Sequence, residues 1–378
     1  MITSLWIDNF KSLNEFELRL ERFVCLVGLN GSGKSTVLQV IDLLSQLMRG
    51  DLELWLVERQ WVRSDINSKL SRRLNIDFRV AITLNGLGDL VWEGSLNRKS
   101  LHCTYELVTM AGRNLLKVDE GYCTLKGHDR FPVIFEYQGS ILSQLKSSQL
   151  SEPLVALRDE VLGIRSLDLL SPESLRLKTR DAGGDLGLGG KKLAAFIHES
   201  GSNGKQDLLM RLQRVYPQLT GIETRSLRSG WKQLEIEEQF NGQKLPTIAR
   251  HVNDGMLRLM AILAQLHSSH QFLLFDEIEN GINSELVEFL VDALLESSHQ
   301  VMVTTHSPVI LNYLDIEVAK KSVIYLYRTA QGATRAIRLF DIPSLREKLD
   351  FLGPGEAFMD TDLKCLVDEI TQGCSEGV

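Results

Sequence analysis

Nine residues near the beginning of the chain have the types and spacing of a phosphate-binding loop. They read Gly28-Leu29-Asn30-Gly31-Ser32-Gly33-Lys34-Ser35-Thr36 and match the pattern G-x-x-x-x-G-K-[ST]. The glycines allow backbone N–H groups to approach phosphate oxygens, and a helix that starts here adds the positive end of its dipole. Lys34 would reach the β- and γ-phosphates, Ser35 would ligate Mg²⁺, and Thr36 would contact the α-phosphate. We therefore predict a nucleotide site formed by the loop from Asn30 to Thr36.

Two adjacent carboxylates, Asp276 and Glu277, follow a second apolar run. The run Phe272–Phe275 has the form of a buried strand, whose carboxyl end should face a ligand crevice. At this position Asp276 would hold Mg²⁺, usually through its water shell. Glu277 would then polarise the attacking water. Taken alone, these acids and nearby Glu279 fit a solvated turn better, and only the phosphate loop shifts the interpretation toward hydrolysis.

A histidine ends a third apolar run. Val301–Thr304 leads directly into Thr305-His306-Ser307-Pro308, and Pro308 predicts a turn because proline cannot continue a strand ladder. A single histidine is usually structural. Because His306 follows a buried strand beyond the carboxylate pair, we predict that it hydrogen-bonds the γ-phosphate and senses it.

The residues Asn253-Asp254-Gly255 precede an apolar stripe at helical spacing. The stripe comprises Met256, Leu259, Met260, Leu263 and Leu266. Asn or Asp is a favourable N-cap, so the simplest interpretation is a capped amphipathic helix that packs on the core. The same helix N-terminus could present backbone N–H groups to a phosphate. The sequence alone favours the cap and leaves the second interpretation open.

Strands that alternate with helices must position these groups. Phe23–Val27 is a continuous apolar run, as expected for a strand buried on both faces, and apolar residues at helical spacing follow the phosphate loop. Between about residues 74 and 135, short β-type segments separated by Gly and Asn turns predict an antiparallel meander. Residues 142–219 look mainly helical, and the final third alternates between helix and apolar strand, which implies a parallel sheet.

The predicted fold class is therefore α/β, with one core that an insertion splits. The expected core comprises residues 1–48 and 245–345, and the antiparallel meander comprises residues 49–140. A mainly helical subdomain would span residues 141–244, and residues 346–378 would form a C-terminal tail.

The composition is that of an ordinary globular protein. The 378 residues are 43% apolar and 24% charged, with 42 Lys and Arg against 49 Asp and Glu. This acidic balance disfavours a protein that coats nucleic acid non-specifically. No apolar run approaches the roughly 18 residues of a membrane-spanning helix, so we expect a cytoplasmic protein with no membrane partner. Five Cys without a C-x-x-C pair suggest neither a disulfide framework nor a zinc site.

In their order along the chain, these motifs resemble those of ATP-binding-cassette (ABC) ATPases. More narrowly, they resemble RecF/SMC-like AAA family ATPases of the overcoming-lysogenization-defect and antiviral-defence type. Gly28–Thr36 corresponds to Walker A, Asp276-Glu277 to Walker B and His306 to the switch histidine of that group. Residues 252–257 lie at the position of its signature motif, and residues 279–283 lie at the position of its D-loop. The resemblance implies an ABC-type P-loop ATPase head that uses ATP and Mg²⁺.

Two further site residues come from the resemblance alone. Ile7–Leu13 is similar to the "NF+SL" strand entry of the group, which implies that Lys11 lies at the nucleotide. Gln138, which follows an aromatic run, is the candidate for the Q-loop glutamine and hence for a metal ligand. Asn253 replaces the signature serine of transporter-type cassettes. The sequence shows no long heptad arm, and we expect no fused TOPRIM nuclease, because only about 70 residues follow His306.

The resemblance also implies a head-to-tail dimer, or a higher oligomer, that closes on ATP. Each nucleotide would lie between Gly28–Thr36 of one subunit and Asn253–Gly255 of the other, with Glu277, Lys34 and His306 as catalytic groups. For the biological role we favour a slow ATPase that acts as sensor and scaffold for a separate effector, such as a nuclease, in antiviral defence. The alternative is a RecF-like ATPase that binds DNA in repair or recombination. A transporter motor is disfavoured because Asn253–Gly255 replaces a Ser-Gly-Gly core.

Overall fold

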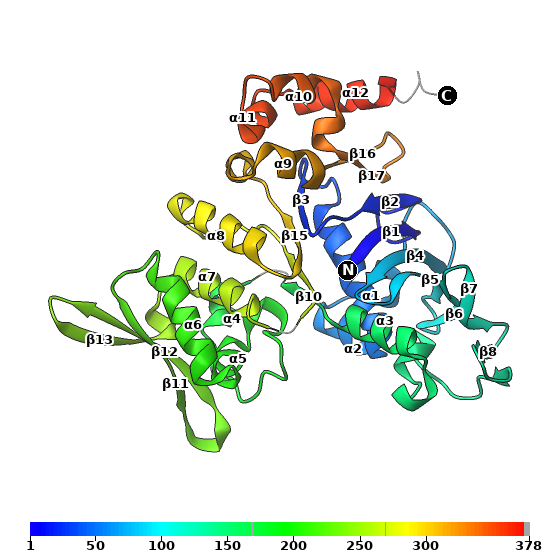
Figure 1. The fold of residues 1–378 in the computed structure, drawn as a ribbon, viewed down its shortest axis with the longest axis horizontal. Coiled ribbons are helices and arrows are strands. Elements are labelled where there is room, and N and C mark those ends of the chain that lie inside the picture. Colours follow the sequence, from blue (N-terminus) through cyan, green and yellow to red (C-terminus); the bar gives the residue numbers. More distant parts are fainter. Residues whose placement is uncertain (168–169, 269, 374–378) are drawn as a thin grey trace.

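The computed structural model describes residues 1–167, 170–268 and 270–373, and it confirms the predicted α/β fold class (Figure 1). Its centre is a six-stranded sheet in the order β10-β14-β15-β3-β16-β17. The strands are Ile164–Leu167 (β10), Phe272–Phe275 (β14), Gln300–Thr304 (β15), Phe23–Val27 (β3), Val323–Arg328 (β16) and Thr334–Arg338 (β17). All neighbouring pairs are parallel except β16 and β17. The carboxyl ends of the five parallel strands therefore meet at one edge.

Both faces of this sheet are covered, because its strands are apolar on both sides. In β3, Cys25 and Val27 join the apolar cluster on one face, whereas Val24 and Leu26 join the cluster on the other. Helices pack on each face: α1 (Lys34–Arg49) on the second, and α7 (Asp254–Gln265), α8 (Ser284–Glu296) and α9 (Ile316–Ser322) on the first. The phosphate loop thus joins a fully buried strand to a buried helix.

The predicted antiparallel meander is present, and it is larger than expected. Its eight strands, in sheet order, are Phe16–Arg19 (β2), Ile2–Asp8 (β1), Asn75–Leu84 (β4), Gly88–Asn97 (β5), His102–Met110 (β6), Arg113–Asp119 (β7), Tyr122–Leu125 (β8) and Phe131–Pro132 (β9). Helices α2 (Leu52–Glu58) and α3 (Glu152–Leu162) share its apolar cluster. The assignment of residues 1–20 to the parallel core is corrected, because β1 pairs antiparallel with β4.

The segment 141–244 is only partly helical, which corrects the prediction of a mainly helical subdomain. Its helices are α3, α4 (Pro172–Leu175), α5 (Leu193–Glu199) and α6 (Gly201–Gln213). A three-stranded antiparallel sheet follows, formed by β11 (Leu219–Ser226), β12 (Lys232–Phe240) and β13 (Gln243–Ile248). Leu234 and Ile236 alternate with more exposed neighbours in β12, which is the period of a half-buried strand. This sheet projects from the helical lobe at the lower left of Figure 1.

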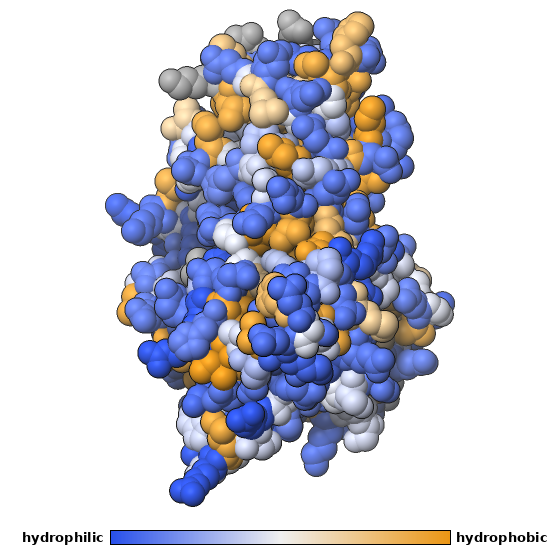
Figure 2. Space-filling model, turned by 90° about the vertical axis from the view of Figure 1, so that its left-hand side faces the viewer, coloured by the Kyte–Doolittle hydropathy of each residue, from blue (hydrophilic) through white to orange (hydrophobic). Residues whose placement is uncertain are grey.

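Residues 346–373 of the predicted C-terminal tail are mainly helical and pack on the core. Helices α10 (Pro343–Lys348), α11 (Pro354–Met359) and α12 (Leu363–Gly373) bury Leu345, Phe358 and Leu366 in the cluster of the first face. Figure 2 shows the side of the molecule that lies at the left of Figure 1, where apolar residues form small groups among hydrophilic ones. In the part of the chain that the structure describes, no helix has the length and apolar character needed to cross a membrane.

Candidate nucleotide site

The phosphate loop, residues 28–36, connects β3 to α1 as the sequence predicts, and its glycines have conformations that other residues rarely adopt. The φ angles are +148° at Gly28, +77° at Gly31 and +110° at Gly33. A Cβ atom on Gly28 would lie 2.3 Å from the carbonyl oxygen of Leu326, and one on Gly33 would lie 2.5 Å from Thr334 Oγ1. Gly28 and Gly33 are therefore required both for backbone conformation and for close packing.

Side chains from distant parts of the chain hold this loop. Thr334 Oγ1 donates to the carbonyl oxygen of Ser32 (2.9 Å), and Ser12 Oγ lies 2.8 Å from Thr334 Oγ1. Arg328 Nε donates to the carbonyl oxygen of Gly31 (2.8 Å). The sequence analysis missed Thr334 and Arg328, which lie about 300 positions after the loop and match no motif.

Lys34 turns back onto its own loop. Its Nζ donates to the carbonyl oxygens of Gly28 (2.7 Å) and Leu29 (3.3 Å). Burial lowers the pKa of Lys34, and three carboxylates oppose this shift, namely Asp276, Glu277 and Glu279. The amine thus lies in the electrostatic field of the acids that follow β14, although they lie 242 to 245 positions later in the sequence.

The carboxylate pair is held by hydrogen bonds, and the histidine side chain lies beside it. Thr304 Oγ1 donates to Asp276 Oδ1 (2.5 Å) and accepts from the backbone N–H of Glu277 (2.8 Å). His306 Nε2 lies 3.4 Å from Glu277 Oε1, and Asn280 Nδ2 donates to Glu277 Oε2 (3.2 Å). The structure therefore brings together Asp276, Glu277 and His306, and it adds Thr304 and Asn280, which the sequence analysis did not select.

The histidine turn and the phosphate loop share a cavity. The cavity has a volume of about 450 Å³, and its lining includes Gly28, Leu29 and Asn30 on one side and Thr305 and His306 on the other. The parallel pairing of β15 with β3 explains this proximity, because the two turns follow adjacent strands at the same sheet edge. This edge is where open α/β sheets bind ligands.

The helix N-terminus at Asn253 is capped, as the simpler prediction stated. Asn253 Oδ1 accepts from the backbone N–H of Met256 (2.7 Å). Arg176 pairs with Asp254 and donates to the carbonyl oxygen of Val252 (2.7 Å). A Cβ atom on Gly255 would lie 2.9 Å from the carbonyl oxygen of Gly281. Among the described residues, no hydrogen bond or ion pair joins residues 253–255 to the phosphate loop.

Lys11 lies beside α1, one helical turn beyond Ser35. Its Nζ donates to Gln39 Oε1 (2.8 Å) and lies 3.3 Å from the centroid of the Trp61 ring. Gln39 follows Ser35 by four residues and so lies on the same face of the helix. The structure thus places Lys11 near the predicted magnesium ligand, in a cation–π contact with an aromatic ring.

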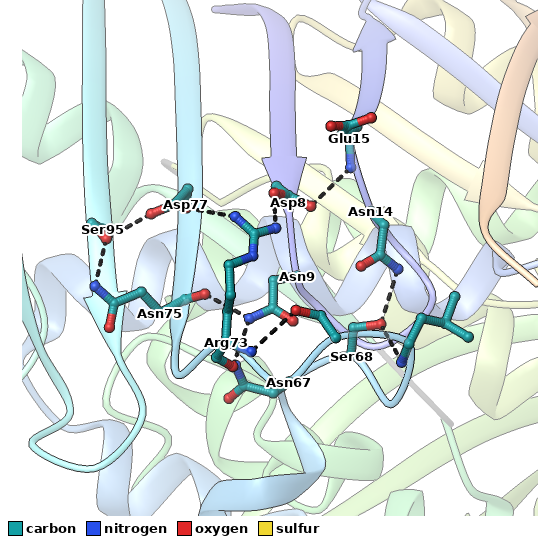
Figure 3. A network of polar contacts seen from close by, with 12 residues as sticks. Asp8, Asn9, Asn14, Glu15, Asn67, Ser68, Arg73, Asn75, Asp77 and Ser95 are labelled. Carbon is teal, nitrogen blue, oxygen red and sulfur yellow. Dashed lines mark hydrogen bonds and ion pairs between the residues drawn. The ribbon is translucent and has the colours of Figure 1, made fainter.

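Polar contacts fix the turn that carries Lys11 and Ser12 (Figure 3). Asn9 Nδ2 donates to the carbonyl oxygens of Arg73 (3.0 Å) and Asn75 (2.7 Å), and the guanidinium of Arg73 pairs with Asp8. This network gives the "NF+SL" segment a structural role: it holds the turn whose Ser12 supports the phosphate loop through Thr334.

Gln138 does not reach the site, so its prediction as a metal ligand is corrected. Its side chain bonds Glu53 instead, accepting from the backbone N–H (2.9 Å). The next residue, Gly139, packs on the carbonyl of Leu47 at the far end of α1. Leu47 follows Ser35 by twelve residues, or about 18 Å along a helix. The residues beside Asp276 and Glu277 are instead Leu170, Ser171 and Pro172, which share a cavity of about 230 Å³ with them and follow β10, the parallel neighbour of β14.

The strand order separates the phosphate loop from the carboxylate pair by one strand, β15, and this arrangement is that of an ABC-type ATPase head. The chain belongs to the family described as "AAA domain, putative AbiEii toxin, Type IV TA system". The model of this family matches residues 116–312, which is more than half of the chain. A second model, described as "AAA ATPase domain", matches residues 1–152.

Solved structures with the same fold include heads of Smc proteins. An Smc head bound to the C-winged helix domain of ScpA has a TM-score of 0.57 at 16% identity, over 90% of this chain and 99% of that one. The Pyrococcus furiosus Smc head bound to the C-terminal domain of ScpA gives 0.53 at 16%, over 92% and 99%. The Pyrococcus yayanosii Smc head gives 0.50 at 12%, over 89% and 97%. At these identities the likeness shows the fold alone. No curated protein matches the chain.

Proposed function

We propose that this protein binds and hydrolyses ATP with Mg²⁺ at the edge where the phosphate loop meets the carboxylate pair. The observation that carries the proposal is the cluster of Asp276, Glu277 and His306 at the same sheet edge as Lys34, in which His306 Nε2 lies 3.4 Å from Glu277 Oε1. Ser35 and Asp276 offer the oxygen ligands that Mg²⁺ prefers. When bound, the ion would neutralise charge on the phosphate oxygens.

The chain's own residues position the reactants and stabilise charge. Lys34 would exchange the carbonyl oxygens of Gly28 and Leu29 for phosphate oxygens, and the backbone N–H groups of the loop would bind the same phosphates. Glu277, held by Asn280, would orient the attacking water, and His306 would donate to the γ-phosphate. Such positioning and charge stabilisation supply most of the catalysis in phosphoryl transfer.

The test is the Glu277→Gln variant. Gln keeps the shape of the side chain and cannot accept a proton, so we expect turnover to fall by roughly 10²- to 10⁴-fold while ATP still binds. Steady-state phosphate release and titration with a fluorescent ATP analogue measure the two quantities. Glu288→Gln, on the exposed side of α8, is the matched control and should behave as the parent chain. Near-normal turnover of Glu277→Gln would remove Glu277 from catalysis.

We further propose that two copies of the chain enclose ATP head to tail. The N-terminus of α7 lies against Gly281 rather than against its own phosphate loop, so a phosphate bound by its backbone N–H groups would have to come from another molecule. In the dimer, Asn253–Gly255 of one subunit would face the γ-phosphate held by the other. The Glu277→Gln variant, which retains ATP, should accumulate this dimer in gel filtration.

For the biological role, we propose control of a separately encoded effector in antiviral defence. Two findings support this proposal: the family description names a toxin of a type IV toxin–antitoxin system, and the similar Smc heads are bound to ScpA domains. Affinity purification from cells would use Glu277→Gln with ATP, and Lys34→Ala would be the matched chain with weakened nucleotide binding. A second protein enriched only with Glu277→Gln would support an ATP-dependent effector. Identical sets of bound proteins would contradict it.

The second candidate role is a RecF-like ATPase that acts on DNA. This role is motivated by scattered clusters of basic residues, which include Lys69, Arg72, Arg176 and Lys191. Arg176 and Lys191 already pair with Asp254 and Glu58, which weakens this reading. DNA-stimulated hydrolysis that declines steeply with salt would favour it. Hydrolysis that is indifferent to DNA would leave the effector role.

A further inference from the structure

Glu279 lies two residues after the proposed catalytic carboxylate and contacts the turn that carries His306. Its Oε1 atom is close to three donors: the Thr305 hydroxyl (3.0 Å), the His306 backbone N–H (2.8 Å) and the Ser307 backbone N–H (3.1 Å). The other oxygen, Oε2, is buried and has no hydrogen-bond partner. One carboxylate oxygen thus satisfies most of the donors of this turn.

The turn needs this acceptor, because β15 ends at Thr304 and the next helical segment starts only at Pro308. The backbone N–H of Thr305 still bonds the carbonyl oxygen of Leu26 in β3 (3.2 Å), and that of Ser307 also bonds Thr305 Oγ1 (2.9 Å), whereas the acceptor of the His306 N–H is Glu279 Oε1. Consecutive N–H groups that point to one side form a concave anion site, which a carboxylate fills well. The conformation of residues 305–307 then sets the direction of the His306 imidazole. Its Nε2 atom lies 3.4 Å from Glu277 Oε1.

We propose that Glu279 is a positioning residue for ATP hydrolysis: it anchors the His306 turn to the segment that carries the catalytic carboxylate. Glu279 acts as a hydrogen-bond acceptor through Oε1 and takes no part as base or metal ligand. This inference rests on the proposed ATPase function. It states that replacement of Glu279 lowers ATP turnover only because it disturbs the position of His306. The carboxylate also fixes the distance between two segments, residues 276–280 and 305–307, that come from neighbouring parallel strands.

The geometry predicts different behaviour of variants for the two roles that Glu279 could have, hydrogen-bond acceptor or negative charge. In a Glu279→Gln variant the amide oxygen can occupy the place of Oε1 and keep all three hydrogen bonds. The amide NH₂ would occupy the place of Oε2, where it displaces no partner because Oε2 has none. Glu279→Ala loses the acceptor altogether. Glu279→Gln should therefore keep the three hydrogen bonds that Glu279→Ala removes. At position 277, by contrast, the change to Gln is expected to lower turnover.

The experiment compares Glu279→Ala, Glu279→Gln and Glu277→Gln in the full chain, by kcat, by ATP affinity and by thermal unfolding. For Glu279→Ala we expect kcat to fall about tenfold or more with ATP affinity within about threefold, because orientation of a catalytic group is lost and the phosphate loop is intact. Glu279→Gln should rescue kcat to within about threefold of the parent chain, whereas Glu277→Gln should not. Normal kcat in Glu279→Ala, or a Glu279→Gln variant as impaired as Glu277→Gln, would overturn the proposal.

A double-mutant cycle with His306→Ala gives a readout that general destabilisation does not reproduce. If Glu279 acts through His306, Glu279→Ala should add less than about twofold to the loss in His306→Ala. Additive losses would show an independent role and overturn the proposal. Should Glu279→Ala fail to fold, Glu279→Gln decides alone by the criterion above. A parent chain without any ATPase activity would refute the proposed function itself, an outcome distinct from a normal Glu279→Ala in an active protein.

Discussion

The phosphate loop and the N-terminus of α7 are both phosphate-binding structures by type, yet the chain surrounds them differently. Around the loop, Thr334 and Arg328 bond its carbonyls, and Leu326 approaches Gly28 so closely that no Cβ fits. Around the helix N-terminus, Asn253 caps the helix with its own side chain, and the adjoining contacts come from Arg176 and Gly281. The loop is held by contacts within one chain, whereas Asn253 and Asp254 at the helix N-terminus are exposed.

This difference explains why the two regions should respond differently to mutation. Changes in the loop act on a preformed binding site and alter affinity and stability in a single chain. Changes at the α7 N-terminus should leave folding and initial ATP binding almost intact and should act only when a second copy is present. Four predictions, ordered by the expected effect, test this comparison.

Lys34→Ala should have the largest effect. It removes the one side-chain cation of the phosphate loop, and the loss of a charge-assisted contact weakens ATP binding by roughly 10- to 100-fold. The N–H groups of the loop would remain. Isothermal titration with ATP and Mg²⁺ measures the change, and Lys321→Ala, an exposed lysine at the end of α9, is the matched control. Unchanged affinity would mean that the loop does not bind nucleotide through Lys34.

Mixing two inactive variants tests the proposed role of the α7 N-terminus in a site shared between two chains. Asp254→Trp keeps the Asn253 cap and loses one partly exposed ion pair, which costs at most about 1 kcal/mol of stability. Its bulk should disrupt only the composite site that this helix N-terminus completes and still permit dimers to form. An equal mixture of Asp254→Trp and Lys34→Ala chains would contain dimers with one intact composite site, so up to about a quarter of parental turnover should return. A mixture as inactive as its components would argue against shared sites.

Gly33→Ala and Gly31→Ala form a matched pair within the loop. Both positions have positive φ, and such strain costs about 1–3 kcal/mol of unfolding free energy in a non-glycine residue. Gly31 has open space around it, whereas a Cβ on Gly33 would collide with Thr334. We expect Gly33→Ala to lose roughly 1–3 kcal/mol more, because it adds overpacking to strain. Urea unfolding measures both, and equal losses would show that the Thr334 contact is not tight.

Much of the site could be read from the sequence, because its motifs are local. The loop from Gly28 to Thr36, the carboxylate pair and the Asn253 cap are each set by adjacent residues. The residues that hold these motifs were missed, since Thr334 and Thr304 are ordinary β-strand residues whose roles arise from strand order alone. The same holds for β1 and β2, whose short apolar alternation fits either sheet until the pairing partner β4 is known.

The smallest expected effect is at Gln138, where sequence position and spatial position disagree. Gln138 follows an aromatic run ahead of the helical segment, as a Q-loop glutamine should, but it bonds Glu53 near the far end of α1, about 18 Å from Ser35. Gln138→Ala should therefore leave kcat and the Mg²⁺ requirement unchanged within about twofold, since its exposed bonds are worth little. Phosphate release over a Mg²⁺ titration checks this, with Ser35→Ala as the variant that should shift the requirement. A shift with Gln138→Ala would mean that α1 and the meander rearrange when ATP binds, because only then could this side chain reach the metal.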